Sequence, residues 1–255
     1  MLSAIRRSDG ATVLAYDESK RNGPFACSQC GDPVILKTGT SRINYFAHQN
    51  TLRCLSAANE SDLHRRCKME IYEALIKDPN VQKVRLERPL GTVRPDVSAV
   101  INGVPVAIEV QISNLSIENI LYRTIEYHRK GVYVLWLLPW TMKLNEQRYS
   151  PTLWEKWVHA AYFGRVYYWT QNLDIVSYRF EPHLKSVPKA KLHSPAGKEI
   201  TVGGYTIRSK RFRTPVLEAR LNLVNDFHPC ERYWWEGNGV KVPDAKICMH
   251  HPRKS

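Results

Sequence analysis

Two acidic residues occupy positions that a short hairpin would bring together. Asn102-Gly103 separates two alternating apolar segments, and this dipeptide is typical of a type I′ turn because both residues accept a positive φ. A two-residue loop pairs Ile101 with Val104 and, counted back along both strands, Asp96 with Glu109. Carboxylates at paired positions lie roughly 5 Å apart and repel each other. A divalent cation bound by oxygen atoms of both would remove the repulsion, so the hairpin predicts half of a metal-dependent active site.

A purely structural interpretation of the hairpin stays open. Asp96 follows Pro95 and fits an ordinary turn, while Glu109 fits the wet face of an amphipathic strand. A bulge would also shift the register of the two strands. The same register pairs Arg94 with Gln111.

Cysteine and histidine residues near the N-terminus have the form of a small zinc ribbon. A Cys-x-x-Cys turn followed by glycine presents two thiolates from one knuckle, and a two-strand insertion leads to a histidine and a third cysteine. The expected zinc ligands are Cys27, Cys30, His48 and Cys54, with His64 or Cys67 as substitutes for the fourth. A segment this small has no core of its own, so zinc would supply its folding energy. Reduced, buried cysteines are the alternative.

A second set of ligand types, His228-x-Cys230 with Cys248-x-His250, fits no strong zinc template. Its aromatic neighbours favour a structural role, and metal binding there is left open. Six cysteines in a chain that we expect to be cytoplasmic favour metal ligation over disulfides.

The elements around these residues predict a compact α/β core with a mixed sheet. The expected order is a helix over 60–77, a strand over 83–87, the hairpin, a helix over 116–130 and a buried strand from residue 132. Short strands over 2–5, 12–16, 34–37 and 43–47 come before it. A helix over 151–161 and strands over 165–170 and 174–180 follow, and residues 182–215 are basic and broken by proline and glycine.

The charge balance indicates a polyanionic partner. The chain of 255 residues has 37 basic and 24 acidic residues, a net charge of +13. Nucleic acid is a better expectation than an acidic membrane, because no basic amphipathic helix dominates; solubility charge alone is the alternative. No apolar run reaches the 18 or so residues that cross a bilayer, and no signal peptide is apparent, so we expect no membrane partner.

Several short motifs occur together in one order. They are the Cys-x-x-Cys turn, FAH at 46–48, ESDLH at 60–64, RPD at 94–96, EVQIS at 109–113 and VLWLL at 134–138. In this arrangement the chain resembles the CoiA-like competence protein family, over about residues 1–140. Members of that family are predicted nucleases of the PD-(D/E)xK superfamily with a zinc-ribbon-like N-terminal segment. The resemblance therefore implies a restriction-endonuclease-like mixed-sheet core.

The resemblance assigns roles to the hairpin residues. Asp96 and Glu109 would hold magnesium or manganese, which polarises a phosphodiester and activates water. Gln111 stands where lysine is usual, and since glutamine cannot act as a base it would orient water by hydrogen bonding. In such folds the first helix often lends a carboxylate or a phosphate-contacting group, which makes Glu60, His64 and Lys68 candidates. A surface stripe with a structural histidine is the alternative for that helix.

Basic side chains complete the expected site. Arg123 shares a helix face with Tyr127 and could contact a phosphate bidentately, or form a salt bridge with Glu118 or Glu126 of its own helix. The other expected nucleic-acid contacts are Arg94, Lys210, Arg211 and Arg213. We expect three units: an N-terminal hairpin and zinc-ribbon-like segment (1–58), a nuclease core (59–140) and a basic, aromatic-rich region (141–255).

These residues predict a metal-dependent nuclease that acts on DNA. An RNA nuclease fits equally well, because phosphate contacts look alike. A nucleic-acid-binding adaptor on a nuclease fold that no longer cuts is the alternative from a different class, and Gln111 supports it. A homodimer or a protein partner is left open.

Overall fold

A five-stranded antiparallel sheet forms the N-terminal part of the computed structural model, which describes residues 1–40, 42–49, 54, 60–112, 115–193, 195, 198–237 and 239–248. Its strands follow the order β2-β1-β3-β4-β5. Their bounds are β1 Ser3–Arg6, β2 Thr12–Leu14, β3 Phe25–Ala26, β4 Pro33–Lys37 and β5 Tyr45–His48. A small cluster of buried apolar residues, among them Phe25, Leu36 and Phe46, forms the core of this sheet. The predicted hairpin and the two strands that follow it are present.

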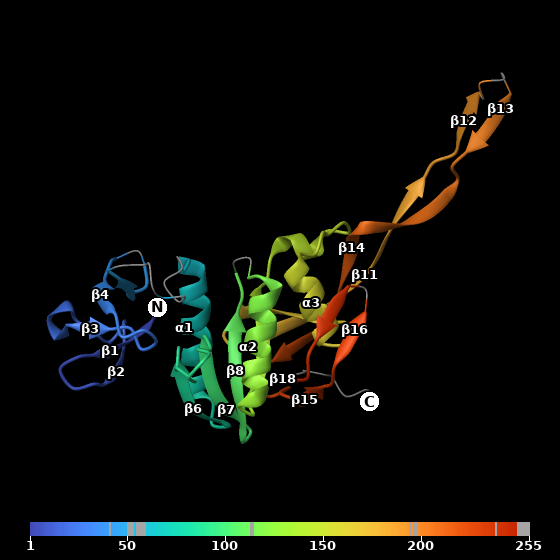
Figure 1. The fold of residues 1–255 in the computed structure, drawn as a ribbon. Helices are drawn as coiled ribbons and strands as arrows, with labels where there is room; N and C mark the ends of the chain where they lie inside the picture. The colour runs from blue at the N-terminus through green and yellow to red at the C-terminus, as the bar shows by residue number, and fades with distance from the viewer. Residues whose placement is uncertain are drawn as a thin grey trace.

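A nine-stranded mixed sheet forms the body of the molecule (Figure 1). Its main path runs β14-β11-β10-β9-β8-β7-β6, and β18 joins β9 and carries β15. The central strand β9 (Tyr133–Pro139) pairs in parallel with β8 and β10, whereas the β7/β8 hairpin and the β6/β7 pair are antiparallel. The other strands of this sheet are β6 Val81–Leu86, β7 Val97–Ile101, β8 Val104–Val110, β10 Val166–Gln171, β11 Asp174–Val187, β14 Tyr205–Asn222, β15 Pro229–Arg232 and β18 Ala245–Cys248.

The central hairpin has the register that the sequence predicts. Ile101 pairs with Val104 and Val97 with Ile108. Asn102 and Gly103 have φ angles of 49° and 80°, as a type I′ turn requires. Asp96 directly precedes β7, and Glu109 lies near the end of β8.

Three α-helices pack against the strands: α1 Asp62–Lys77, α2 Ile117–Arg129 and α3 Leu153–Ala161. α1 contacts β6 and β7, α2 contacts β9 and β18, and α3 contacts β10 and β17 (Val240–Val242). Each helix begins at a hydroxyl cap, because the side chains of Ser61, Ser116 and Thr152 accept hydrogen bonds from backbone N–H groups of the first turn. Gly131, with φ 69°, follows the C-cap of α2, Lys130, which is the last residue of the predicted helix over 116–130. Short 3-10 turns occupy Lys20–Asn22 and Met142–Asn145.

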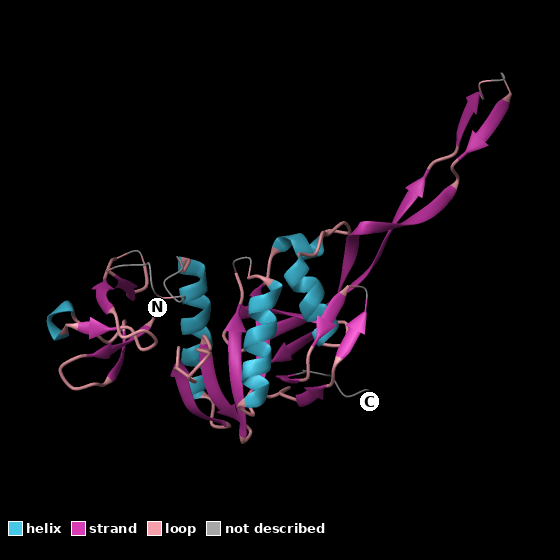
Figure 2. Cartoon of the chain, viewed as in Figure 1, coloured by secondary structure: helices cyan, strands magenta, loops and turns pink. Residues whose placement is uncertain are grey.

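A long hairpin extends away from the body, on the side opposite the N-terminal sheet (Figures 1 and 2). β11 and β14 begin within the nine-stranded sheet and continue beyond it as a pair. β12 (Ala190–His193) and β13 (Glu199–Val202) form the far end. The remaining pair, β16 (Trp235–Gly237) with β17, lies near the C-terminus.

The prediction of a mixed α/β fold with a zinc-ribbon-like N-terminal segment is confirmed. Few helices, one large mixed sheet and an N-terminal cysteine and histidine cluster make up the chain. Strands β10, β11 and β14, all beyond residue 140, continue the same sheet as the hairpin, and the division into three units stays a prediction. No helix among the described residues is both long and apolar enough to cross a membrane.

Candidate functional site

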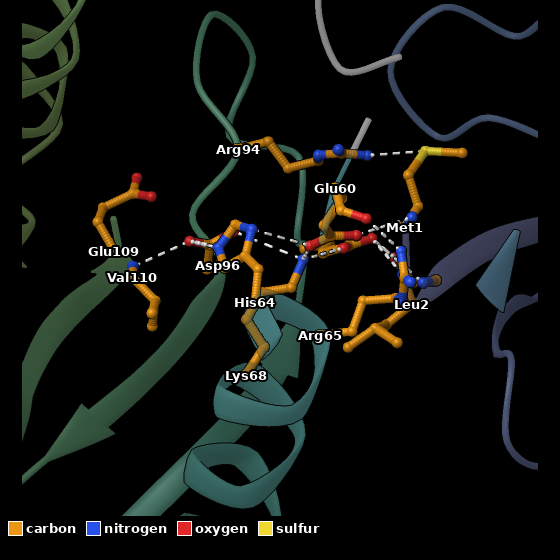
Figure 3. A network of polar contacts seen from close by, with 12 residues as sticks. Met1, Leu2, Glu60, His64, Arg65, Lys68, Arg94, Asp96, Glu109 and Val110 are labelled. Atoms are coloured by element: carbon orange, nitrogen blue, oxygen red, sulfur yellow. Dashed lines mark hydrogen bonds and ion pairs between the residues drawn. The ribbon is translucent and has the colours of Figure 1, made fainter. Parts of the chain in front are cut away.

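An acidic cluster lies where the start of α1 meets the start of β7 (Figure 3). Ligand atoms of Glu60, His64 and Asp96 all lie within 4.8 Å of one another. His64 joins the two carboxylates, since its Nδ1 lies 3.2 Å from Glu60 Oε1 and its Nε2 3.0 Å from Asp96 Oδ2. The same Asp96 oxygen accepts a hydrogen bond of 2.9 Å from the backbone N–H of Val110 on β8. Helix and hairpin are therefore joined through one carboxylate.

Lys68 lies one helical turn beyond His64 and is almost fully buried. Its ammonium group contacts Glu60, lies 2.5 Å from Glu87 Oε1 and lies 3.6 Å from Asp96 Oδ1. Burial alone would lower the pKa of this lysine, but the three carboxylates outweigh burial and raise the pKa above its usual value. Lys68 is therefore a charged ammonium group in this arrangement.

The charges in this cluster also set the pKa values of its other members. Burial works to raise the pKa of Asp96, yet His64 and Lys68 hold it well below its ordinary value. Burial works to lower the pKa of His64, and Asp96 reverses this and raises it. Asp96 is thus an anion over the whole physiological pH range, as a metal ligand must be.

The sequence analysis missed Glu87, which is 2% exposed. Its Oε2 accepts hydrogen bonds from the backbone N–H groups of Leu2 (2.9 Å) and Ser3 (3.2 Å) and from the Ser3 hydroxyl, while Oε1 pairs with Lys68. Burial would raise the pKa of Glu87, but Lys68 holds it well below its usual range. The contact spans more than eighty residues of sequence, and no local pattern around Glu87 marks it.

Glu109 also lies in the core but points away from the Glu60 cluster (Figure 3). One oxygen accepts hydrogen bonds from the Arg123 guanidinium and the Tyr127 hydroxyl, both from α2. Burial raises the pKa of Glu109 to about 7, opposed by Arg123 and supported by the negative charge of Asp96. Asp96 and Glu109 are electrostatically coupled, but among the described residues the three-ligand cluster contains Asp96 without Glu109.

Arg123 and Arg94 lie on the hairpin side of the site. Among the described residues, Arg123 forms its ion pair with Glu109, so the predicted alternative of a salt bridge to Glu118 or Glu126 of its own helix is wrong. Arg123 also donates to the backbone carbonyl of Arg94 at 2.9 Å. The Arg94 guanidinium approaches the Met1 sulfur at 3.4 Å. Gln111 follows β8 and donates its backbone N–H to the Leu137 carbonyl at 2.7 Å.

The N-terminal sheet holds a second group of ligand types. Cys27, Cys30, His48 and Cys54 each offer an atom, and these atoms lie within 4.8 Å of one another. Cys30 Sγ lies 3.4 Å from His48 Nε2. The set matches the four predicted zinc ligands, and no substitute is needed, because His64 belongs to the acidic cluster and Cys67 is buried on α1. Three thiols and an imidazole are the ligands of a tetrahedral structural metal site.

Residues at the start of the chain connect the two groups. Met1 Sδ is 3.8 Å from Cys27 Sγ, and the Met1 amino group is 3.0 Å from Glu60 Oε2. Leu2 and Ser3 follow with their hydrogen bonds to Glu87. Met1, which lies just before β1, thus contacts both the Cys₃His group and the acidic cluster.

The second candidate metal set gains no support within the described residues. Cys230 on β15 pairs with Ile247, and the buried Cys248 on β18 pairs with Pro229, so the two cysteines lie on neighbouring strands. His250 lies outside the described residues. Among those that are described, this region holds no group of three ligand types.

Three predicted nucleic-acid contacts, Lys210, Arg211 and Arg213, lie far from the acidic cluster, on β14 of the long hairpin. Lys210 and Arg211 are exposed. Arg213 is half-buried, and its Nη1 donates to the carbonyl groups of Ser209, Lys210 and Phe212. The structure thus gives Arg213 a local role in shaping the backbone.

The fold and this site define a mixed α/β protein with an attached Cys₃His unit. Residues 60–187, just over half of the chain, match the family model of the nuclease-like domain of competence protein CoiA. Residues 10–57 match the model of the CoiA N-terminal domain. The chain belongs to the CoiA competence protein family, which confirms the resemblance in the sequence.

A curated relative supports this assignment. The competence protein CoiA of Bacillus subtilis (strain 168) is 27% identical over 117 residues, which cover 45% of this chain and 31% of the relative. The match thus spans about a third of the relative's length. No solved structure matches the chain.

Proposed function

We propose that the chain is a metal-dependent nuclease that hydrolyses phosphodiester bonds of DNA. The observation that carries this proposal is the convergence of Glu60, His64 and Asp96 from two elements within 4.8 Å. The two carboxylates are oxygen donors that suit Mg²⁺ or Mn²⁺, and Asp96 is the ligand common to this cluster and to the predicted hairpin pair. The nuclease-like family agrees with this chemistry.

Glu109 enters the proposal as the second hairpin ligand. It is coupled electrostatically to Asp96, and Arg123 and Tyr127 now hold its carboxylate. Binding a cation together with Asp96 would require Glu109 to exchange its contact with Arg123 for the metal. Arg123 would then have its guanidinium available for a phosphate oxygen.

The bound metal ion would polarise the phosphodiester and lower the pKa of a bound water. The chain supplies the remaining parts. Lys68 stays protonated and places a fixed positive charge 3.6 Å from Asp96. Gln111 can orient water through its amide but cannot remove a proton. The Cys₃His group would hold Zn²⁺ and stabilise the N-terminal sheet.

A second candidate function is a nucleic-acid-binding adaptor without cleavage. The specific observation in its favour is that Lys68 already neutralises part of the charge on Glu60, Glu87 and Asp96. A centre balanced in this way needs no cation to remain folded.

Cleavage assays separate the two functions. Purified protein is incubated with labelled single-stranded DNA, duplex DNA and RNA in the presence of Mn²⁺, alongside the variants Asp96→Ala and Glu109→Ala. For a nuclease, cleavage falls by about 100-fold or more in both variants, while binding measured in EDTA is retained. Glu73→Ala is the matched control, because Glu73 is an exposed carboxylate on the same helix, outside the cluster. Equal cleavage by wild type and both variants, or none by any, would favour the adaptor.

A further inference from the structure

The long hairpin forms a two-stranded arm, defined here as residues 181–193 and 199–214. Cross-strand pairs run from Glu181 with Thr214 to Val187 with Tyr205, and β12 and β13 continue with Ala190 opposite Val202. At about 3.3 Å per residue, the arm extends about 40 Å beyond the sheet. It lies apart from the helices and from the other strands (Figure 1). Beyond its base, the arm therefore exposes both of its faces.

The arm carries a strong excess of positive charge. Between residues 181 and 215 the acidic residues are Glu181, at the base of the arm, and Glu199, which pairs with Lys191 at 2.8 Å. The basic residues of this stretch are Lys185, Lys189, Lys191, Lys198, Arg208, Lys210, Arg211 and Arg213. All except Arg213 are exposed. The stretch therefore presents a row of exposed positive charges, which is complementary to a polyanion.

A bulge at the base of the arm concentrates part of this charge. Pro182 pairs with Arg213 and Leu184 with Arg208, so the four residues Ser209–Phe212 lie opposite His183 alone. The Arg213 guanidinium holds the bulge together through three carbonyl groups. Backbone hydrogen bonds in both directions between Tyr149 and Arg213 (2.9 and 2.8 Å) fix it to the body. These hydrogen bonds fix the conformation of the bulge.

Phe212 organises the cations around the bulge. The Arg148 guanidinium lies 3.9 Å from the centre of the Phe212 ring, and that of Arg211 lies 5.2 Å from it. Arg148 comes from the loop before α3, so two segments contribute to one cluster. Guanidinium groups held against an aromatic ring lose little further freedom when they bind phosphate oxygens.

The far end of the arm has one apolar and one polar face. Ala190 pairs with Val202 and Leu192 with Ile200, and these four side chains lie on the same face because residues two apart in a strand share a face. Leu192 is 50% exposed, Ile200 41% and Val202 39%. Lys191 and Thr201 form the opposite face.

We propose that this arm binds duplex DNA by entering a groove, with the bulge on the phosphate backbone and the apolar face of the far end against the base edges. A two-stranded ribbon fits the major groove of B-DNA, and apolar side chains there contact thymine methyl groups. The arm spans about one helical turn, so bulge and far end reach different turns of the backbone. The proposal rests on the proposed function in taking DNA as the partner, and adds the preference for duplex.

Binding without cleavage tests the arm. Fluorescence anisotropy in EDTA measures the affinity for a labelled duplex of about three helical turns and for a single strand of the same length. Lys210→Ala/Arg211→Ala removes charge at the bulge, and replacing residues 188–204 by Asn-Gly joins the paired residues Val187 and Tyr205 and removes the far end. Lys77→Ala/Lys156→Ala is the matched control, since both lysines are exposed on helices of the body.

We expect the bulge variant to weaken duplex binding about tenfold. The slope of log affinity against log salt concentration should fall by an amount that corresponds to about two fewer released counterions. The shortened arm loses duplex affinity to a similar extent and binds the single strand as the wild type does. The control variant retains the wild-type affinity within about twofold.

Three results would overturn the proposal. Duplex affinity that survives both arm variants removes the arm from DNA binding. An equal loss for single strand and duplex shows charge attraction without groove entry. A wild-type dimer that becomes a monomer when the arm is shortened, with duplex affinity unchanged, assigns the arm to a second copy of the chain; sedimentation measures this.

Failure of the proposed function is distinguishable from failure of the arm. The arm test in EDTA needs no catalysis, and Asp96→Ala protein should show the same arm-dependent duplex binding as the wild type. If the wild type never cuts DNA, but the arm variants bind duplex DNA more weakly than the wild type, the proposed nuclease activity is refuted and the proposed role of the arm stands.

Discussion

Lys68 Nζ lies 2.5 Å from Glu87 Oε1, and the two side chains are only 3% and 2% exposed. The pair joins α1 to the end of β6, and Glu87 in turn holds Leu2 and Ser3 of the N-terminal sheet. A buried charge that loses its partner costs about 3–5 kcal/mol. We therefore expect Lys68→Met to lower the free energy of unfolding by about this amount, as measured by urea denaturation, whereas Lys77→Met on the exposed side of α1 changes it by less than about 0.5 kcal/mol.

Glu87→Gln provides the complementary change. It keeps the shape of the side chain but removes its charge, so Glu60 and Asp96 are the carboxylates that still face the Lys68 ammonium group. The double variant Lys68→Met/Glu87→Gln should be less destabilised than the sum of the single variants by about 1–3 kcal/mol. Additive effects would show that the two groups do not depend on each other.

Metal removal should act first on the N-terminal sheet. Cys27 and Cys30 lie within 4.8 Å of His48 and Cys54, and the sheet around them has only a small core. We expect about one zinc atom per chain by elemental analysis and none in Cys27→Ser/Cys30→Ser, because two ligands do not retain zinc. Cys248→Ser is the control, since this buried cysteine belongs to the strand β18, and it should leave the zinc content unchanged. Equal zinc in wild type and the double variant would contradict the site.

The contact between Arg123 and Glu109 should be measurable as a coupling free energy in a double-mutant cycle. Arg123→Leu leaves the buried Glu109 carboxylate without its cationic partner, with the Tyr127 hydroxyl still donating to it, so we expect a loss of about 3–5 kcal/mol in the free energy of unfolding. Glu109→Gln in the same background should recover part of it, with a coupling of about 1–3 kcal/mol. Arg129→Leu, whose guanidinium pairs with Glu126 at the surface, is the control and should cost less than about 1 kcal/mol.

The features that could be predicted from sequence are those encoded over short distances. Asn102-Gly103 determines its own turn, and the alternating residues beside it determine which side chains face each other, so the β7/β8 register follows. Ser61 and Ser116 mark the starts of α1 and α2 in the same way. The spacing of the two cysteines in the Cys-x-x-Cys turn itself indicates metal ligation. In each case the information lies within a few residues.

The features that were missed depend on distant pairing. Glu87 finds Leu2 and Ser3 only after the N-terminal sheet docks against α1. Glu60 and His64 were candidates from their place on the first helix, but their approach to Asp96, and the contact of Glu109 with Arg123, follow from tertiary packing that no local pattern specifies.

The arm was missed for a related reason. Pro182 and the pair Gly203-Gly204 indicated irregular chain, but a two-stranded ribbon has an unpaired edge on each strand where proline loses no ladder hydrogen bond. At Gly203, with φ 84°, an added Cβ would lie 2.0 Å from the Pro188 carbonyl oxygen. Glycine therefore permits the two chains to approach closely between the β11/β14 pair and the β12/β13 pair. Both residue types therefore fit a hairpin that local patterns cannot reveal.

His159 on α3 should make the stability of the fold depend on pH. Burial lowers its pKa, and the charges of Arg179 and Arg213 lower it further, while its ring stacks on Phe180 at 5.7 Å. The unfolded chain takes up a proton at about pH 6.5, whereas the folded chain resists it until a lower pH. The contribution of His159 is therefore complete above about pH 6.5 and is lost as the pH falls through that value. His159→Phe keeps the stacked ring without the titration, so urea denaturation at about pH 5.5 and 7.5 should show a smaller difference between the two pH values than in the wild type. Phe180→Leu, which retains the imidazole, should lower stability at both pH values and keep a pH-dependent difference; an unchanged difference in His159→Phe would assign the pH dependence to other groups.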